Sequence, residues 1–270
     1  MTGALADSAE RVASLLRAFF VVERTAASEG FLQARDPRAK LVSITALVVA
    51  AMLTRSVAVL VAMGAIVVGL ALLSSVPLRT LLARSTFVPA ATLLVVAPQA
   101  VLQPGETVVA ALGLRVTGAG VAYVLLFTLR VGVSVALLSL LVLTTPFSSV
   151  VAAMRGLGVP TPLVWVVAVT YRYLFLFFDE LRRLLLARNS RTTGGDGLRA
   201  EWRDARRLAG TFLLRSLERG ERVGRGMRAR GGARPPAPYR RSRSLDHGDV
   251  ALGGLAAVAV ATSVVIRWGL

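Results

Sequence analysis

Residues 119–143 read AGVAYVLLFTLRVGVSVALLSLLVL, and Arg130 is the one charged residue in this stretch. An α-helix rises 1.5 Å per residue, so about 20 apolar residues are enough to cross a hydrocarbon core of about 30 Å. The stretch is longer than that, which allows a helix to cross with some tilt. It predicts a transmembrane helix and makes lipid part of the solvent of this protein.

Further apolar runs lie on both sides of this stretch, in a chain of 270 residues that is 55% hydrophobic. Asp36 followed by Pro37 is typical of a helix start and stands just before the first run. The predicted fold is an all-α integral membrane protein with about five transmembrane helices plus two long basic helices at the cytoplasmic surface. The other four predicted transmembrane runs are 41–53, 57–73, 86–102 and 250–266.

Charge predicts the orientation, because short cytoplasmic loops of membrane proteins carry an excess of Arg and Lys. Arg35, Arg38 and Lys40 precede the first run, and Arg79 and Arg84 follow the second. We therefore expect the N-terminus and the connection after the second run to be cytoplasmic. The segment 103–118 contains Pro104, Gly105, Gly113 and Gly118 and only two charges, and it is expected to be an external loop.

The apolar run 162–178 could be taken for another transmembrane helix, but the charge that follows it argues against a crossing. Residues 179–243 contain 18 Arg and 7 acidic residues, a net charge of +11 out of the +17 of the whole chain. A crossing would carry this charge outside, against the positive-inside rule. We expect 162–189 to be one long helix at the cytoplasmic interface, a hinge at 194–197, and a second basic helix over about 201–230.

Known catalytic and metal-binding motifs are missing from the sequence. There is no cysteine and His247 is the only histidine, so thiolate and imidazole metal sites are excluded. Lys40, the only lysine, does not lie in a Gly-rich phosphate-binding loop, so the chain has no ATPase motif of its own. We expect no enzymatic activity, no catalytic residues, no cofactor and no metal ligands. We also assign no metal site to His247 beside Asp246 and Asp249.

Two similar tripeptides end the two predicted basic helices: Ala187-Arg188-Asn189 and Ala229-Arg230-Gly231. The simpler interpretation is electrostatic, because Arg near a helix C-terminus is favoured by the helix dipole. A guanidinium is also suited to binding a partner, since it makes bidentate and permanently charged contacts with carboxylates.

Other motifs accompany these tripeptides in a recognisable order, and with them the chain resembles the transmembrane T component of energy-coupling factor (ECF) transporters, the EcfT/CbiQ family. The resemblance extends over about residues 29–266. Asn189 departs from the family pattern, in which Gly or Ser is commoner. The further motifs are Gly30-Phe31-Leu32-Gln33, Asp36-Pro37-Arg38-Ala39-Lys40-Leu41, Met154-Arg155-Gly156-Leu157-Gly158-Val159-Pro160, Ser216-Leu217-Glu218-Arg219 and Met227-Arg228-Ala229-Arg230-Gly231.

The resemblance implies a non-catalytic coupling subunit of an ECF-type ABC importer in the cytoplasmic membrane. Ala187, Arg188, Asn189, Ala229, Arg230 and Gly231 would dock two ABC-type ATPase subunits. Their ATP-driven closure would move the two helices and so act on a small membrane S component that binds the substrate. That component would pack on the apolar faces around 162–178 and 208–217. The substrates implied are cobalt or nickel ions or a vitamin, and residues 30–41 look most like the cobalt and nickel branch.

In domain terms, we expect an amphipathic segment over 1–40, four transmembrane helices over 41–145, a cytoplasmic coupling-helix domain over 146–245 and a last transmembrane helix over 246–270. Besides the ATPases and the S component, the lipid bilayer is the expected partner, and nucleic acid is not.

Two other functions remain open at this stage. A self-contained secondary transporter would need polar groups at the membrane midplane, where Arg130 stands nearly alone. A membrane-tethered binder of anionic ligands would use the basic block 179–243. Leu208, Phe212, Leu213 and Leu217 lie at helical spacing in that block, which favours packing against protein.

Overall fold

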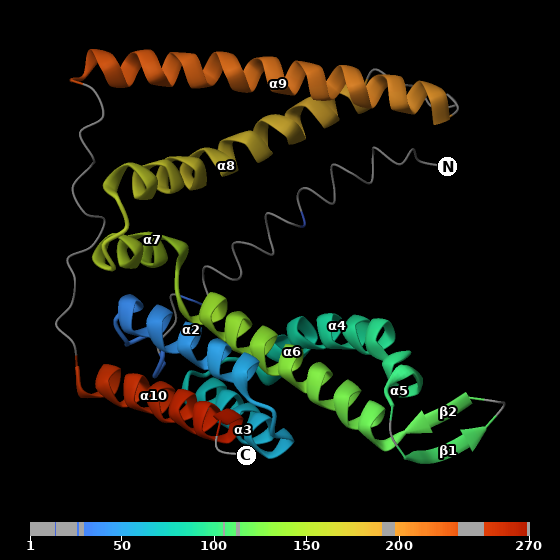
Figure 1. Cartoon of the computed structure of the whole chain (residues 1–270). Helices are drawn as coiled ribbons and strands as arrows, with labels where there is room; N and C mark the ends of the chain where they lie inside the picture. The colour runs from blue at the N-terminus through green and yellow to red at the C-terminus, as the bar shows by residue number, and fades with distance from the viewer. Residues whose placement is uncertain are drawn as a thin grey trace. The chain divides into compact units, whose positions relative to one another are not determined.

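The computed structural model describes residues 30–104, 106–111, 114–190, 198–231 and 246–268, together with Ser14 and Ala26 (Figure 1). Helices dominate these residues, and the predicted all-α membrane fold is confirmed. Four helical stretches are long and apolar enough to cross a membrane, namely Leu78–Leu102, Gly118–Thr144, Thr161–Arg188 and His247–Trp268, and Val57–Leu73 is a shorter apolar helix. In chain order the elements are α2 (Pro37–Leu53), α3 (Val57–Leu73), α4 (Leu78–Val96), α5 (Gln99–Leu102), β1 (Thr107–Ala111), β2 (Leu114–Thr117), α6 (Gly118–Thr144), α7 (Phe147–Gly156), α8 (Thr161–Asn189), α9 (Leu198–Ala229) and α10 (His247–Trp268).

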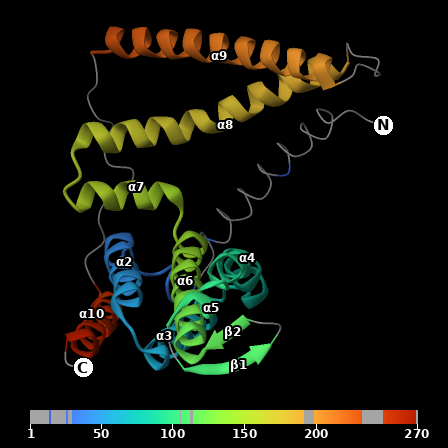
Figure 2. The ribbon, with the colours of Figure 1, turned by 45° about the vertical axis from the view of Figure 1, so that its right-hand side comes forward.

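The chain divides into two compact units. One unit contains α8 and α9, and the other contains α2 to α7 together with α10. In the larger unit, α6 packs against α2, α3, α4 and α5, while α10 packs along α2 (Figure 2). Leu47, Leu60, Leu137 and Leu140 are almost completely buried in the core of this bundle.

Two polar side chains connect α2 and α6 at separate levels. Lys40, near the start of α2, donates from Nζ to the carbonyl oxygen of Thr144 at the end of α6 (3.0 Å). Arg130, in the middle of α6, donates from Nη2 to the carbonyl oxygen of Thr54, which caps the end of α2 (2.9 Å). The partners are fourteen residues apart on each helix, so the two helices run antiparallel in a matched register.

Hydrogen bonds gather four helix ends at one end of this unit. The buried carboxylate of Asp249, in the first turn of α10, accepts from the backbone N–H of Asp36 at the start of α2 (3.0 Å). Ser74, after α3, accepts from the backbone N–H of Leu32 (3.2 Å). Together with the Lys40 contact, these bonds place the start of α2, the end of α3, the end of α6 and the start of α10 together. The sequence predicted these four positions to share one side of the membrane, and the structure groups them accordingly.

Two boundaries differ from the prediction. Helix α4 begins at Leu78, so Arg79 and Arg84 lie within a helix and not in a connection, which agrees with the high helix propensity of Arg after the proline at position 77. The segment expected to be a loop contains the antiparallel hairpin β1–β2, in which Thr107 pairs with Thr117 and Val109 with Val116. β-branched residues favour such strands. Of the predicted amphipathic segment 1–40, the structure describes Ser14, Ala26 and residues 30–40, and the predicted hinge 194–197 lies outside the described residues.

Candidate functional site

Helix α8 is a single helix of 29 residues, as predicted for 162–189. Gly158 precedes it with a φ of +86°, a left-handed conformation that glycine adopts without strain. Pro160 occupies the N-cap position and Pro162 lies in the first turn, where a missing backbone N–H costs nothing. The sequence between α7 and α8 therefore ends one helix and starts the next within a few residues.

Helix α9 has 32 residues and lies against α8 as an antiparallel partner. The rings of Phe177 and Phe212 meet edge to face with their centroids 6.1 Å apart. One turn further along each helix, Arg215 Nη1 donates to Glu180 Oε1 at 2.5 Å. A ring contact and an ion pair thus hold the two helices together over the same stretch.

Arg188, the first candidate docking arginine, lies near the end of α8 and forms an ion pair with α9. Its Nη2 donates to Oδ2 of Asp204 at 3.2 Å. The Arg188 side chain is 20% exposed to solvent, and the Asp204 side chain is 23% exposed. The neighbouring Ala187 is exposed, and Asn189 is the last residue of α8. The guanidinium is therefore held against its own hairpin in this structure.

Arg230, the second candidate, follows the last helical residue of α9, Ala229, and both are exposed. The backbone N–H of Arg230 donates to the carbonyl of Met227 at 3.1 Å, and that of Gly231 donates to Arg228 at 3.2 Å. Gly231 has a φ of +95°, which is typical of the glycine that ends a helix. The glycine of this tripeptide thus has a structural role, while the arginine beside it points to solvent.

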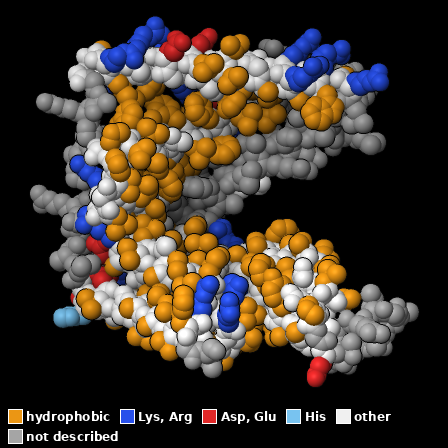
Figure 3. Space-filling view, viewed as in Figure 1, with side chains coloured by type: hydrophobic (Ala, Val, Ile, Leu, Met, Phe, Trp, Pro, Cys, Tyr) orange, Lys and Arg blue, Asp and Glu red, His pale blue; other side chains and the backbone are white. Residues whose placement is uncertain are grey.

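The two candidate arginines lie at opposite ends of α9. Arg188 contacts this helix at Asp204, and Arg230 lies 26 residues further along. At 1.5 Å per residue the two contact points are about 39 Å apart along the helix axis. The structure therefore does not bring the two tripeptides together into one site. Figure 3 shows Lys and Arg side chains gathered towards both ends of α9, with hydrophobic side chains between them and along α8.

An apolar cavity of about 380 Å³ lies between α8 and α9 on the side of Phe177 away from Arg188. On the α9 side it is bordered by two glycines one turn apart, which leave the helix backbone open to a neighbour. Its walls include Trp165, Tyr173 and Phe177 from α8 and Gly220, Gly224 and Met227 from α9. The face predicted on α8 contributes to it, whereas the α9 wall lies beyond the predicted 208–217. Leu213, Leu214 and Leu217 are exposed.

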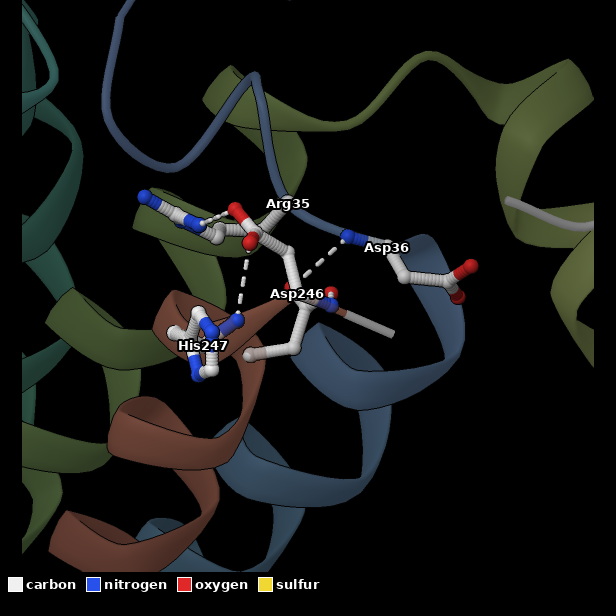
Figure 4. Close-up of polar contacts among 5 residues, drawn as sticks. Arg35, Asp36, Asp246 and His247 are labelled. Atoms are coloured by element: carbon white, nitrogen blue, oxygen red, sulfur yellow. Dashed lines mark hydrogen bonds and ion pairs between the residues drawn. The ribbon is translucent and has the colours of Figure 1, made fainter. Parts of the chain in front are cut away.

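The remaining candidates of the sequence have structural partners. Arg130 donates to the carbonyl of Thr54, as expected for a paired intramembrane charge. Asp246 accepts from Arg35 Nη1 (2.9 Å) and from the backbone N–H of His247 (2.8 Å), as Figure 4 shows. The hydrogen bond from the His247 backbone and that from Arg35 lower the pKa of the Asp246 carboxyl.

The second carboxylate of this cluster belongs to Asp249. It accepts from the backbone N–H groups of Asp36 and Asp246, both at 3.0 Å. Within the described part of the chain, no three His, Asp or Glu side chains are grouped as metal ligands would be.

Two acidic partners of the basic helices, Asp204 and Glu180, were not predicted from the sequence. Each lies opposite an arginine in the hairpin, at 3.2 Å from Arg188 and at 2.5 Å from Arg215, respectively. The signal that could have found them is antiparallel register. With Phe177 beside Phe212, antiparallel pairing brings Arg188 within one turn of Asp204, while Glu180 and Arg215 each lie one turn past the ring contact.

Comparison with known proteins identifies the family. Residues 29–239 match the CbiQ family, described as cobalt transport protein. An uncharacterized protein of Methanocaldococcus jannaschii, MJ1571, is 28% identical over 228 residues, which cover 82% of this chain and 78% of that protein. A second uncharacterized protein of this organism, MJ1089, is 30% identical over 83 residues, 31% of each chain. The protein is therefore a multi-pass membrane component of a transport system and belongs to the CbiQ family of cobalt transport proteins, the EcfT/CbiQ family.

Proposed function

We propose that this chain is the non-catalytic coupling subunit of an ECF-type importer, and that Arg188 and Arg230 each dock one ABC-type ATPase subunit. The observation that carries the proposal is the position of the two tripeptides at opposite ends of α9, about 39 Å apart along its axis. That spacing is too large for one groove and suits two separate subunits. Ala187 and Ala229, both exposed, leave room beside each arginine for a partner surface.

The proposal places α8 and α9 on the cytoplasmic side, and the helix ends of the larger unit support this. The chain leaves that unit after Leu157 and returns to it at Arg240. Thr144 at the end of α6 and Asp249 at the start of α10 lie at the same end of the unit. If α8 crossed the membrane, α9 would have to cross back. Helix α9 contains nine Arg residues, and each charge at the centre of a bilayer costs several kcal/mol. Although α8 is apolar and long enough to cross, parity favours an interfacial position.

The coupling motion acts, in this proposal, through the cavity between α8 and α9. Phe177–Phe212 and Glu180–Arg215 join the helices near their middles, whereas the cavity extends from Phe177 towards the Arg230 end. Movement of one ATPase against the other shifts the Arg230 end relative to the Arg188 end, which changes the width of this apolar gap. A separate membrane S component that packs on these helices responds to that change. The S component selects the substrate, for which we propose cobalt or nickel ions in line with the family.

Co-purification of the full chain with its ATPases tests the proposal. The double variant Arg188→Ala/Arg230→Ala should remain in the membrane but retain neither ATPase subunit, and ATP-dependent uptake of Co²⁺ should be lost. Arg225→Ala is the matched control, because it removes one exposed arginine of α9 outside both tripeptides. Normal retention of both ATPases by the double variant would rule out docking through these residues.

A further inference from the structure

The two proposed docking arginines differ in availability. Arg188 is paired with Asp204 and is four-fifths buried. Arg230 is exposed, and no ion pair joins it to another residue of the described ranges. An arginine that enters a groove on another protein must extend from its own surface. Arg230 meets this condition as it stands, whereas Arg188 has to leave a carboxylate first.

We propose that Asp204 is a positioning residue that occupies Arg188 until an ATPase carboxylate replaces it, so that docking begins at Arg230 and is completed at Arg188. This inference rests on the proposed function and adds an internal competitor and an order of binding to it. Asp204 offers the guanidinium the chemistry that an acidic groove offers, since both are carboxylates that accept from Nη atoms. Docking at the Arg188 end is therefore an exchange of one ion pair for another.

The internal pair is weak enough to be exchanged. Asp204 and Arg188 both retain contact with water, and pairs of this kind contribute little because solvent screens them and their side chains must be ordered. Removing the Asp204 charge should tighten ATPase binding about two- to fivefold, the range expected for the loss of one partly exposed pair. A larger change would require a fully buried pair, which this one is not.

The hairpin does not depend on Asp204 for its assembly. Phe177 and Phe212 pack ring against ring, and Glu180 pairs with Arg215, all at a distance from Asp204 along the helices. Asp204→Asn keeps the size of the side chain and leaves these contacts in place. The variant is therefore expected to fold, and its effect on binding can be assigned to Arg188.

The test measures the dissociation constant of the full-length chain in lipid nanodiscs for the purified ATPase pair that co-purifies with it. Asp204→Asn should bind two- to fivefold more tightly, and Asp204→Glu, which keeps the charge, should bind like the unaltered chain. Glu218→Gln is the control for net charge, because it also removes one carboxylate from α9. Glu218 pairs with Arg222 and not with Arg188. It should leave the affinity unchanged.

A second arm separates this inference from the proposed function. Arg188→Ala should weaken binding less than Arg230→Ala does, and the gain from Asp204→Asn should vanish in an Arg188→Ala background. If Asp204→Asn binds equally or less tightly, or gains affinity without Arg188, the competitor role is wrong even though docking stands. If neither arginine variant weakens binding, the proposed function itself fails.

Discussion

Asp249 Oδ1 accepts a hydrogen bond from the backbone N–H of Asp36 at 3.0 Å, which joins residues 213 positions apart in the chain. The other carboxylate oxygen of Asp249 accepts from the backbone N–H of Asp246, also at 3.0 Å. Asp249 is only 4% exposed. The first and last described helices of the larger unit thus begin at the same place because one buried carboxylate binds both of their starts.

Asp249→Asn should lower the stability of the protein. An amide offers one acceptor oxygen where the carboxylate offers two, so one buried N–H loses its partner, at a cost of about 1–3 kcal/mol. The melting temperature in detergent measures the effect. Asp246→Asn is the matched control, since it neutralises an exposed carboxylate of the same cluster and should lower the melting temperature less. Equal losses in both variants would contradict the central role of Asp249.

Lys40→Met and Arg130→Met should each destabilise the contact between α2 and α6. Each removes the charged donor to a backbone carbonyl, that of Thr144 or of Thr54, and hydrogen bonds to charged groups contribute about 1.5–3 kcal/mol. The two contacts are fourteen residues apart on both helices, so their effects should add in the double variant. Unfolding measurements on both single variants and the double variant check this. Strong non-additivity would mean that the two contacts do not act as separate connections.

Helix positions in this protein follow from the sequence more readily than helix contacts do. The start of α2 was predicted from Asp36 and Pro37, and the Asp36 side chain does accept from the backbone N–H of Arg38 at 2.8 Å. Such a cap is local. The bond between Asp36 and Asp249 is not, and neither apolar runs nor charge spacing indicates which helices meet across 213 residues.

The candidate site shows the same division between local and distant information. Arg188 and Arg230 are candidates because each follows an alanine near a helix end, which is a pattern within a few residues. Asp204 was not predicted, because its contact with Arg188 depends on the register between α8 and α9. The start of α4 was missed for another reason. The charges of Arg79 and Arg84 predict a connection, but arginine is also a good helix former, and both residues lie within α4.

Gly120→Ala should separate α5 from α6. A Cβ at this position would lie 2.6 Å from the carbonyl oxygen and 2.7 Å from the Cα of Ala100, which are backbone atoms that cannot turn away. Overpacking of this kind typically costs about 1–3 kcal/mol. The melting temperature should fall accordingly. Gly254→Ala in α10 is the control, because a Cβ there meets no atom within 4 Å, and its melting temperature should stay the same or rise.

Acidification should weaken the contact between Arg35 and Asp246. The pKa of the Asp246 carboxyl is lowered in the folded protein by its hydrogen bonds from the His247 backbone and from Arg35. Its contribution to stability is therefore fully present above the unfolded pKa of about 4 and is lost as the pH falls through the lower folded value. Melting temperatures from pH 7 to pH 3 measure this. The difference between the unaltered chain and Asp246→Asn should shrink towards the acid end, and a constant difference would contradict the assignment.

Labelling of single cysteines should place the end of α8 and the start of α10 on the same side of the membrane. The chain contains no cysteine, so one introduced thiol gives an unambiguous signal. Ser190 and His247 are exposed at these two positions, and Arg55 is exposed between α2 and α3, at the opposite end of the larger unit. In intact cells, a membrane-impermeant maleimide should label Arg55→Cys but neither Ser190→Cys nor His247→Cys.

The three positions distinguish every arrangement that matters for the proposed function. All three thiols should react once the membrane is permeabilised, which controls for burial. Labelling of Ser190→Cys alongside Arg55→Cys in intact cells would mean that α8 crosses the membrane and that Arg188 faces away from any ATPase. Labelling of Ser190→Cys and His247→Cys without Arg55→Cys would mean that the whole bundle is inverted in the membrane. Both candidate arginines would then lie outside the cell. Because ATP is hydrolysed in the cytoplasm, either result would be incompatible with docking through Arg188.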